Sequence, residues 1–510
     1  MLVTRLAIPV LTFAISLGQS DGKEVTRQIV DLGYAKYEGV PSAFGNTNFL
    51  GVRYAAPPTG NLRFREPYPP SKTSGIQVAD THPYRCRNGD QNTTSTLNKR
   101  DFNPPPNDED CLFLNLVVPG TEIKPSAKLP VVLVGVDTTP GQGGEDVIFD
   151  GNDLVQLSGG KAIAILIQYR LGVYGFLAGE DVKKGGALNA GLLDQQFAFK
   201  WIQKHISKFG GDPRRVTLWG ESAGAGSVLQ QLIANGGQTS PPLFDSAILS
   251  SIYYPPQYKY NDPVPEKVYN DVVRIAGCDG RQNKLDCLRG ADVLLLDKAG
   301  RDITFGGFYF TTYIQPRNVL IVANTNEGSI FVDPAYSSDL TSYISALLPT
   351  ISPRDAKLGA ELYEGLGSVL DQAIKFNGEF IFICPTYALL RSLNGHGYKG
   401  HFAVPPAAHY QDAPYYFPSS SASGAPLFNN TAFINTFGGS FLDFAVHGTP
   451  NVNRTGSLLP YWPKWREPGQ KEATFNRTES LEPDVHISET PSDLLERCRF
   501  WDSIGQSVGH

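Results

Sequence analysis

The sequence predicts an α/β protein whose core is a large, mostly parallel sheet with helices on both faces. Short runs of Val, Ile, Leu and Ala at residues 131–134, 162–167, 246–249 and 319–323 have the continuous apolar character of strands buried on both faces. Residues 194–206, between the second and third of these runs, follow the pattern of a helix. Apolar strands that alternate with helices are typical of a parallel sheet, because each crossover lays a helix on the sheet.

One large domain fits these strands better than two. They continue from residue 131 to a last candidate at residues 401–404, with no internal repeat and no low-complexity linker between them. The 510 residues are 41% hydrophobic and 18% charged, as in an ordinary globular protein with ample core. A net charge of −6 without long Lys/Arg runs argues against a nucleic-acid partner. We therefore expect a single domain over residues 21–510.

The N-terminus has the pattern of an export signal. Arg5 precedes an apolar stretch at residues 6–17, and small residues around Gly18 offer a cleavage site. That stretch is too short to span a bilayer as a helix, and no later segment is long and apolar enough to do so. We expect residues 1–20 to be a signal peptide, with an uncleaved anchor as the alternative, and the mature protein to be secreted without a stable membrane span.

The cysteines and the glycosylation sequons agree with export. An even number of six cysteines in a secreted chain indicates disulfides, whose pairing does not follow from the spacing alone. Sequons of the form Asn-x-Ser/Thr, which accept glycans in a eukaryotic secretory pathway, occur at Asn92, Asn429, Asn453 and Asn476. We expect a disulfide-bonded glycoprotein; the alternative for one or two sequons is chance occurrence.

Ser222, in Gly-Glu-Ser-Ala-Gly, carries the most functional information in the chain. An apolar, β-prone run at residues 216–219 precedes it and a helical pattern at 228–233 follows, which is the setting of a nucleophile elbow. Flanking glycines are needed there because Cβ atoms would collide in so tight a turn. The same Gly-x-Ser-x-Gly pattern at Ser20 and Ser507 lacks this setting. Ser222 is therefore the candidate nucleophile.

The chain has no P-loop, no dinucleotide fingerprint after a strand and no His-Glu-x-x-His, so we expect neither a cofactor nor a catalytic metal.

Further stretches carry a resemblance to a known family. They are Glu-Asp-Cys-Leu-Phe-Leu-Asn at 109–115, Tyr-Arg-Leu-Gly-Val-Tyr-Gly-Phe-Leu at 169–177, Asn-Ala-Gly-Leu-Leu-Asp-Gln at 189–195 and Phe-Gly-Gly-Asp-Pro at 209–213. With the elbow, they cover most of residues 40–255. The chain resembles the type-B carboxylesterase/lipase family, the cholinesterase-like branch of the α/β-hydrolases, and particularly its fungal secreted members. The resemblance implies the α/β-hydrolase fold and a serine esterase that works through an acyl-enzyme intermediate.

A serine nucleophile needs an imidazole base and an acid that orients the base, and in this fold they follow in the order Ser, acid, His. Glu327, in Asn-Glu-Gly-Ser directly after the strand at 319–323, matches the family's acid motif. His409, in Pro-Ala-Ala-His-Tyr-Gln-Asp, matches its catalytic histidine, whereas His401 lies in the preceding candidate strand and His447 precedes a Gly-Thr-Pro turn. The alternatives are a solvated loop glutamate and an ordinary surface or core histidine.

The resemblance also implies a pairing of the cysteines. The expected disulfides are Cys86–Cys111, Cys278–Cys287 and Cys384–Cys498. All six cysteines are then used, so none remains for catalysis or for binding a metal.

The chain departs from the family at the oxyanion hole. Family members follow the strand at 131–134 with a His/Tyr-Gly-Gly-Gly segment whose backbone N–H groups hold the oxyanion, but residues 136–140 here are Val-Asp-Thr-Thr-Pro. Ala223, directly after the nucleophile, should still donate its N–H, and Thr138 and Thr139 are candidates for the other donors. Loss of one such donor typically lowers the rate by about 10²–10³.

Together these residues predict a secreted serine carboxylic ester hydrolase with a Ser222–His409–Glu327 triad, an atypical oxyanion hole and a small-molecule ester as substrate. One alternative is a repurposed enzyme of a fungal biosynthetic pathway, such as a cyclase, a lyase or an acyl transferase. The other is a non-catalytic, cholinesterase-like binding protein. The sequence makes no prediction of the oligomeric state.

Overall fold

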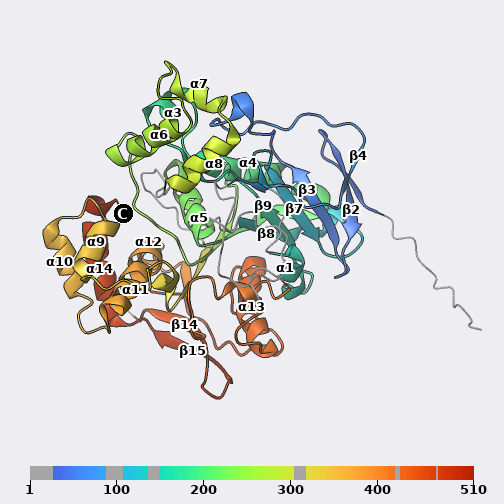
Figure 1. Ribbon diagram of the computed structural model, residues 1–510. Helices are drawn as coiled ribbons and strands as arrows, with labels where there is room; N and C mark the ends of the chain where they lie inside the picture. Colours follow the sequence, from blue (N-terminus) through green and yellow to red (C-terminus); the bar gives the residue numbers. More distant parts are fainter. Residues whose placement is uncertain are drawn as a thin grey trace, which may run out of the picture.

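In the part of the chain that the structure describes, a single sheet of 13 strands forms the centre of the molecule (Figure 1). The structure, a computed structural model, describes residues 27–87, 107–135, 149–303, 318–419, 425–466 and 469–509. The strand order is β1-β2-β3-β7-β9-β8-β10-β11-β12-β13-β14-β15, with β4 beside β2; β5 and β6 form a separate pair. The strands are β1 (Ile29–Asp31), β2 (Lys36–Pro41), β3 (Thr47–Arg53), β4 (Ile76–Ala79), β5 (Arg85–Cys86), β6 (Asn107–Asp108), β7 (Phe113–Val118), β8 (Leu129–Gly135), β9 (Ile163–Ile167), β10 (Gly211–Glu221), β11 (Ser246–Ser250), β12 (Asn318–Asn324), β13 (Gly397–Phe402), β14 (Lys471–Arg477) and β15 (Pro483–Glu489).

The middle of the sheet is parallel and its two ends are antiparallel. Every neighbouring pair from β9 through β8, β10, β11, β12 and β13 to β14 is parallel. Antiparallel pairs join β1, β2, β3, β7 and β9 at one end and β14 to β15 at the other. The expected α/β class with a mostly parallel sheet is therefore confirmed.

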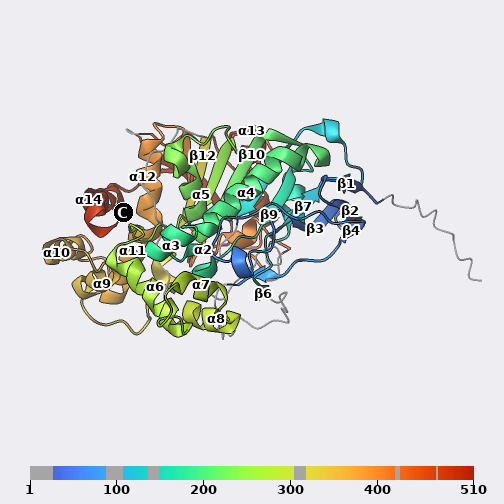
Figure 2. The same cartoon turned by 90° about the horizontal axis from the view of Figure 1, so that it is seen from above.

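Alternate residues of the central strands face two different cores. In β8, Val131 and Leu133 belong to the core that α4 and α5 cover, whereas Val132 and Val134 belong to the core that α1 and α13 cover (Figures 1 and 2). Side chains of a strand alternate between its faces, so burial of both faces requires the continuous apolar runs seen in the sequence. The α-helices are α1 (Gly151–Leu157), α2 (Gly172–Phe176), α3 (Glu180–Gly185), α4 (Ala190–His205), α5 (Ala223–Ile233), α6 (Pro263–Ile275), α7 (Lys284–Arg289), α8 (Val293–Asp302), α9 (Leu340–Leu347), α10 (Pro353–Glu361), α11 (Val369–Gly378), α12 (Cys384–Ser392), α13 (Thr431–His447) and α14 (Ser492–Val508).

Two excursions from the sheet form helical clusters. Helices α6, α7 and α8 lie between β11 and β12 in the chain and, with α2 and α3, enclose a small separate core at the top of Figure 1. Helices α9 to α12 lie between β12 and β13 and pack with α14 on the left of the same view. The second excursion leaves the sheet after β12, one of the strands whose ends carry the candidate site.

The last predicted strand begins earlier than the sequence suggested. We expected it at residues 401–404, but β13 comprises Gly397–Phe402. Its first four residues, Gly-Tyr-Lys-Gly, are not an apolar run, yet they are buried because β13 lies between β12 and β14. The buried Lys399 ammonium lies 3.7 Å from the Glu472 carboxylate on β14, which explains how a lysine is accommodated there.

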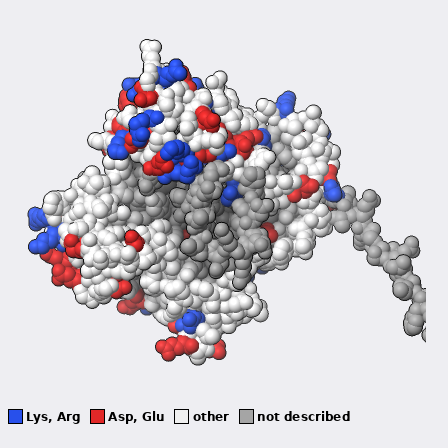
Figure 3. Space-filling model, in the orientation of Figure 1, with Lys and Arg blue, Asp and Glu red and all other residues white. Residues whose placement is uncertain are grey.

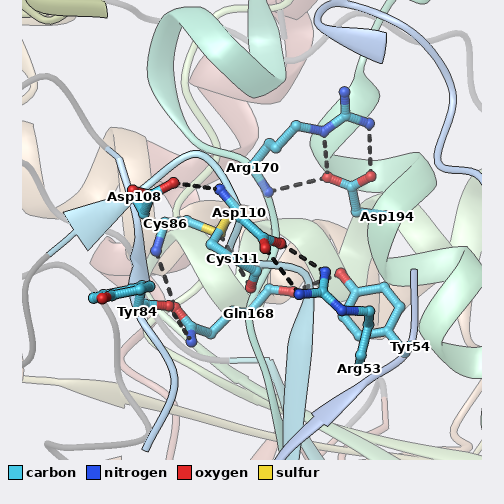
Figure 4. The surroundings of a disulfide bond; sticks show 10 residues. All are labelled: Arg53, Tyr54, Tyr84, Cys86, Asp108, Asp110, Cys111, Gln168, Arg170 and Asp194. Carbon is cyan, nitrogen blue, oxygen red and sulfur yellow. Dashed lines mark hydrogen bonds and ion pairs between the residues drawn. A yellow bond between two sulfur atoms is a disulfide. The ribbon is translucent and has the colours of Figure 1, made fainter. Parts of the chain in front are cut away.

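Three disulfides join the six cysteines in the arrangement that the resemblance implies. They are Cys86–Cys111, Cys278–Cys287 and Cys384–Cys498. Around the first of them, the Cys86 N–H donates to Gln168 Oε1 (3.0 Å), and Arg53 binds both oxygens of Asp110 at 2.6 and 2.8 Å (Figure 4). These contacts hold the residues next to the disulfide against the ends of β3 and β9. The third disulfide joins the first residue of α12 to α14, 114 positions later.

Acidic and basic side chains lie together on the face of the molecule seen in Figure 3, chiefly over α6–α8 at the top and α10 at the left. Several are paired one helical turn apart, such as Lys267 with Asp271 at 2.7 Å. Exposed pairs of this kind contribute little to stability but keep a surface hydrated. Within the described ranges, no helix combines the length and the apolar character that crossing a bilayer requires.

Candidate active site

Ser222 occupies a strained turn between β10 and α5. Its φ and ψ are 51° and −120°, a backbone conformation that residues other than glycine rarely adopt and that commonly marks a functional site. A Cβ at Gly220 would lie 2.3 Å from the Gly224 carbonyl carbon, so the turn closes only because Gly220 lacks a side chain. The predicted strand at 216–219 and helix at 228–233 lie inside β10 and α5. The local sequence therefore folds as the strand–turn–helix unit it indicated.

The structure brings Ser222, His409 and Glu327 together into one chain of hydrogen bonds. His409 Nε2 lies 2.8 Å from Ser222 Oγ, and His409 Nδ1 lies 2.6 Å from Glu327 Oε2. All three residues are buried. They follow the carboxyl ends of β10, β13 and β12, which meet at one edge of the parallel sheet. The loops after β12 and β13 are joined directly, because the Asn326 N–H donates to the Ala407 carbonyl oxygen (2.8 Å).

The Glu327 carboxylate is held by groups that the sequence did not single out. Its Oε1 accepts from the Ser251 hydroxyl (2.7 Å) and from the Asn324 N–H (2.6 Å), which leaves Oε2 for His409. The Asn324 amide also donates to Ser251 Oγ (3.1 Å) and to Asp412 Oδ1 (3.1 Å). The carboxylate is therefore oriented before any substrate binds. The sequence signal that could have found these residues is their position at the ends of β11 and β12.

Asp412, three positions after His409, is a second buried acid behind Glu327. Its Oδ1 accepts from Asn324 and its Oδ2 from the Tyr416 hydroxyl (2.9 Å). Burial raises the pKa of Asp412 above its usual range, the hydrogen bond from Asn324 opposes that rise, and the nearby negative charge of Glu327 adds to it. Asp412 thus fixes the Asn324 side chain that in turn supports the acid.

A third carboxylate lies on the serine side of the imidazole. Glu221 Oε1 is 3.7 Å from His409 Nε2, and the residue is buried. Opposite charges at this distance favour the charged form of a histidine, so Glu221 and Glu327 together stabilise an imidazolium that forms during a reaction. The imidazole is otherwise enclosed by aromatic rings, with centroids 4.6 Å away for Phe382 and 5.1 Å away for Phe331.

Only one of the predicted oxyanion-hole residues falls in the described part of the chain. Ala223 is the first residue of α5, so its N–H is among the N-terminal groups of the helix that have no acceptor within it. The positive end of the helix dipole also lies there. Thr138 and Thr139 lie outside the described residues.

The remaining candidates from the sequence lie away from the triad. His401, on β13, lies 2.8 Å through its Nε2 from the Thr325 hydroxyl, and burial lowers its pKa. His447 is the exposed last residue of α13, and Ser507 lies on α14. Among the sequons, Asn429 and Asn453 are exposed, Asn476 is half-buried on β14, and Asn92 is outside the described residues, as is Ser20. In the described part of the chain, no three His, Cys, Asp or Glu residues converge as metal ligands would.

The segment that follows His409 is held at Ser419 by the carboxylate of Asp153, whose pKa is raised. Asp153, in the first turn of α1, accepts from the Ser419 N–H (3.0 Å) and hydroxyl (2.8 Å). Burial raises the pKa of Asp153 to about 6, and the two hydrogen bonds from Ser419 oppose that rise. Asp153 therefore binds a proton more tightly in the folded state than in the unfolded state, where its pKa is 3.8. The stability that this proton contributes is fully present at a pH below the unfolded-state pKa of 3.8 and is lost as the pH rises through about 6.

We therefore expect acidification from about pH 7 to about pH 4.5 to stabilise the wild type by about 2 kcal/mol relative to Asp153→Asn, which cannot titrate. The free energies of unfolding of both proteins in urea at the two pH values measure this difference. If the free energies of unfolding of the wild type and Asp153→Asn differed by the same amount at both pH values, the raised pKa of Asp153 would be contradicted.

Comparisons with known proteins identify the family of the chain. The model of the Carboxylesterase family matches residues 26–339. A "Secreted lipase" of Arthroderma benhamiae is 30% identical over 437 residues, which are 78% of this chain and 83% of that protein. "Lipase 4" of Diutina rugosa is 38% identical over 267 residues, 49% of this chain and 48% of that protein. The chain spans about half the length of this and other Diutina rugosa lipases that it matches.

The fold comparison extends over nearly the whole chain. The crystal structure of Aspergillus niger EstA superposes with a TM-score of 0.81 at 26% identity, covering 95% of this chain and 99% of that one. The sheet with its two helical layers is thus the α/β-hydrolase fold that the resemblance implied. The family match, the long fungal relative and this superposition lead to one conclusion. The chain is a member of the carboxylesterase family.

Proposed function

We propose that this protein is a secreted serine carboxylic ester hydrolase in which Ser222 is the nucleophile, His409 the base and Glu327 the acid that orients the base. The observation that carries the proposal is the unbroken hydrogen-bond chain from Ser222 Oγ through the imidazole to Glu327, at 2.8 and 2.6 Å. Such a chain is the requirement for activating a serine hydroxyl at neutral pH.

The reaction has two halves. Ser222 Oγ attacks the ester carbonyl carbon while its proton passes to His409 Nε2, and the carbonyl oxygen becomes the oxyanion of a tetrahedral intermediate. As the intermediate collapses, the imidazolium returns that proton to the leaving alkoxide, and the alcohol departs from an acyl-enzyme. Water then attacks the acyl-enzyme by the same steps, with His409 taking and returning its proton, and releases the carboxylic acid.

The electrostatics of the site favour the charged species of this cycle. Glu327 at 2.6 Å and Glu221 at 3.7 Å stabilise the imidazolium. The Ala223 N–H at the start of α5 donates to the oxyanion, and we propose Thr138 or Thr139 as the source of further donors. Because residues 136–140 replace a glycine run, turnover of simple esters is expected to be slower than in relatives that keep it.

The chemistry around the imidazole points to an uncharged small-molecule ester. Phe331 and Phe382 form an apolar wall beside His409, with ring centroids 5.2 Å apart. The relatives that carry lipase names support a carboxylic ester as the substrate class. Three disulfides and relatives named as secreted support an extracellular location, where disulfides persist. We further propose that the sheet and its helices form one catalytic domain, and that the sequons at Asn429, Asn453 and Asn476 carry glycans.

An organophosphonate tests the proposal in the purified, glycosylated protein. We expect one phosphonyl group per chain on Ser222, located by peptide mass spectrometry, and loss of p-nitrophenyl butyrate hydrolysis in step with labelling. The variant Ser507→Ala is the matched control, because Ser507 lies in the same Gly-x-Ser-x-Gly pattern but on the exposed surface of α14. Ester hydrolysis that persists after Ser222 is fully labelled would contradict the proposal, as would a labelled protein that hydrolyses no ester.

A further inference from the structure

One turn of π-helix lies next to the candidate site, and the proposed function gives it no role beyond the apolar wall to which Phe382 belongs. It comprises Glu379–Ile383 and connects α11 to α12 within the excursion between β12 and β13. Turns of π-helix are rare, and those that occur inside longer helices are frequently found at functional sites. The sequence offers one local reason for the turn: Pro385, two residues after it, has no N–H to donate to the Ile381 carbonyl oxygen four residues earlier, and a proline inside a helix disturbs the regular hydrogen-bond ladder.

The π turn touches the segments that carry the triad. The Tyr254 N–H donates to the Ile381 carbonyl oxygen (3.0 Å), one residue after Tyr253, whose N–H donates to the Ser222 carbonyl oxygen (3.2 Å). On the acid side, a Cβ at Gly378 would lie 2.7 Å from the Gly328 nitrogen, so the helix backbone packs directly on the residue after Glu327. The turn is therefore placed by the same backbone that places Ser222 and the acid.

From this position the turn presents one aromatic ring to the catalytic imidazole. The Phe382 ring centroid lies 4.6 Å from that of His409, with 43° between the ring planes, and the Phe331 ring lies next to Phe382, 5.1 Å from the imidazole. Phe380, two residues earlier, points to the opposite side because successive residues of a helix are rotated by about 100°. It packs on Trp501 of α14 at 5.3 Å. Phe382 and Phe380 are equally buried, each 1% exposed.

The far side of the turn is fixed to the C-terminal helix. Both oxygens of Glu379, the first residue of the turn, accept from Arg497 of α14 at 2.7 and 2.8 Å, and both residues are buried. The disulfide Cys384–Cys498 begins at the residue that follows the turn. A bidentate pair and a covalent bond hold the turn more rigidly than apolar packing alone.

We propose that Phe382 is a positioning residue for His409: its ring limits the rotation of the imidazole and excludes water from one face, and α14 holds that ring in place from behind. The proposal rests on the proposed function only in taking His409 as the base for Ser222. A base that is free to rotate spends less time in the hydrogen bond that activates the serine, and a misplacement of about 1 Å at a reacting group can cost about 10²-fold in rate.

The test compares Phe382→Leu and Phe382→Met with the matched control Phe380→Leu, which removes an equally buried ring from the same turn. Two quantities are measured: the second-order rate of Ser222 phosphonylation, and kcat and KM for p-nitrophenyl acetate, butyrate and octanoate. In both Phe382 variants we expect the phosphonylation rate and kcat to fall about 10-fold for every acyl length, with KM changed less than about 2-fold. Phe380→Leu should keep the wild-type values.

Two results would overturn the proposal. An equal loss in Phe380→Leu would show that the turn matters only as packing, and a change confined to KM or to acyl-length preference would make Phe382 a wall of the substrate pocket. If Phe382→Leu does not fold, Phe382→Met decides, because it keeps the volume without a flat ring; a wild-type phosphonylation rate in it would also overturn the proposal. A wild type that is labelled at Ser222 but hydrolyses no ester would refute the proposed function, while the phosphonylation rates would still test Phe382.

Discussion

Replacing His409 with alanine is expected to lower kcat on a p-nitrophenyl ester by about 10⁴–10⁶-fold with little change in KM. The imidazole, which is the base in the proposed mechanism, lies 2.8 Å from Ser222 Oγ, and without it the hydroxyl stays protonated at neutral pH. Ser222→Ala and Glu327→Ala should each cause losses of a similar order. Double variants should lose little more than the worst single one, because the three residues act as a unit.

The steady-state rates of the single and double variants, with folding checked by circular dichroism, measure this effect. His447→Ala is the matched control, because it removes an exposed histidine at the end of α13, away from the triad. A His409→Ala protein with wild-type kcat would exclude this histidine as the base. Fully additive losses would show that the residues do not form one hydrogen-bonded unit.

Gly328→Ala is expected to impair both stability and catalysis although the residue takes no part in the chemistry. A Cβ at Gly328 would lie 2.0 Å from the Ile374 carbonyl oxygen and 2.7 Å from the Gly378 nitrogen. Both are backbone atoms of α11 and cannot swing aside, so the helix or the Glu327 loop must move. Overpacking of this kind costs about 1–3 kcal/mol or more, and displacement of the acid should lower kcat by about 10–100-fold.

Urea unfolding and steady-state kinetics on the purified variant measure the two effects of Gly328→Ala. Gly280→Ala serves as the control, because no atom lies within 4 Å of a Cβ at that turn position. Its unfolding midpoint and kcat should match those of the wild type. A Gly328→Ala protein with an unchanged unfolding midpoint would mean that the close approach of the loop and α11 is not needed for folding.

The central strands and the elbow could be predicted because local sequence determines them. Strands buried on both faces must be apolar throughout, so the runs at 131–134, 162–167, 246–249 and 319–323 indicated β8, β9, β11 and β12. Glycines at the nucleophile turn are required by sterics, so their spacing around Ser222 was informative without any tertiary context.

Other features depend on contacts between distant residues and left no local signal. The start of β13 is polar, and its burial comes from β12 and β14 rather than from its own sequence. Ser251 supports Glu327 only because β11 and β12 are neighbours in the sheet. The π turn has a local signal in Pro385, but its packing against the two loops of the site is not revealed by any periodicity in the sequence.

The hydrogen bond between Ser222 and His409 joins residues 187 positions apart, and this distance along the chain sets a time as well as a geometry. At about 5–20 residues per second, a ribosome needs roughly 10–40 s to proceed from the serine codon to the histidine codon. During that interval the nascent chain carries the nucleophile without its base. In the proposed mechanism, ester hydrolysis therefore requires that synthesis has passed residue 409 and that the two segments have folded together.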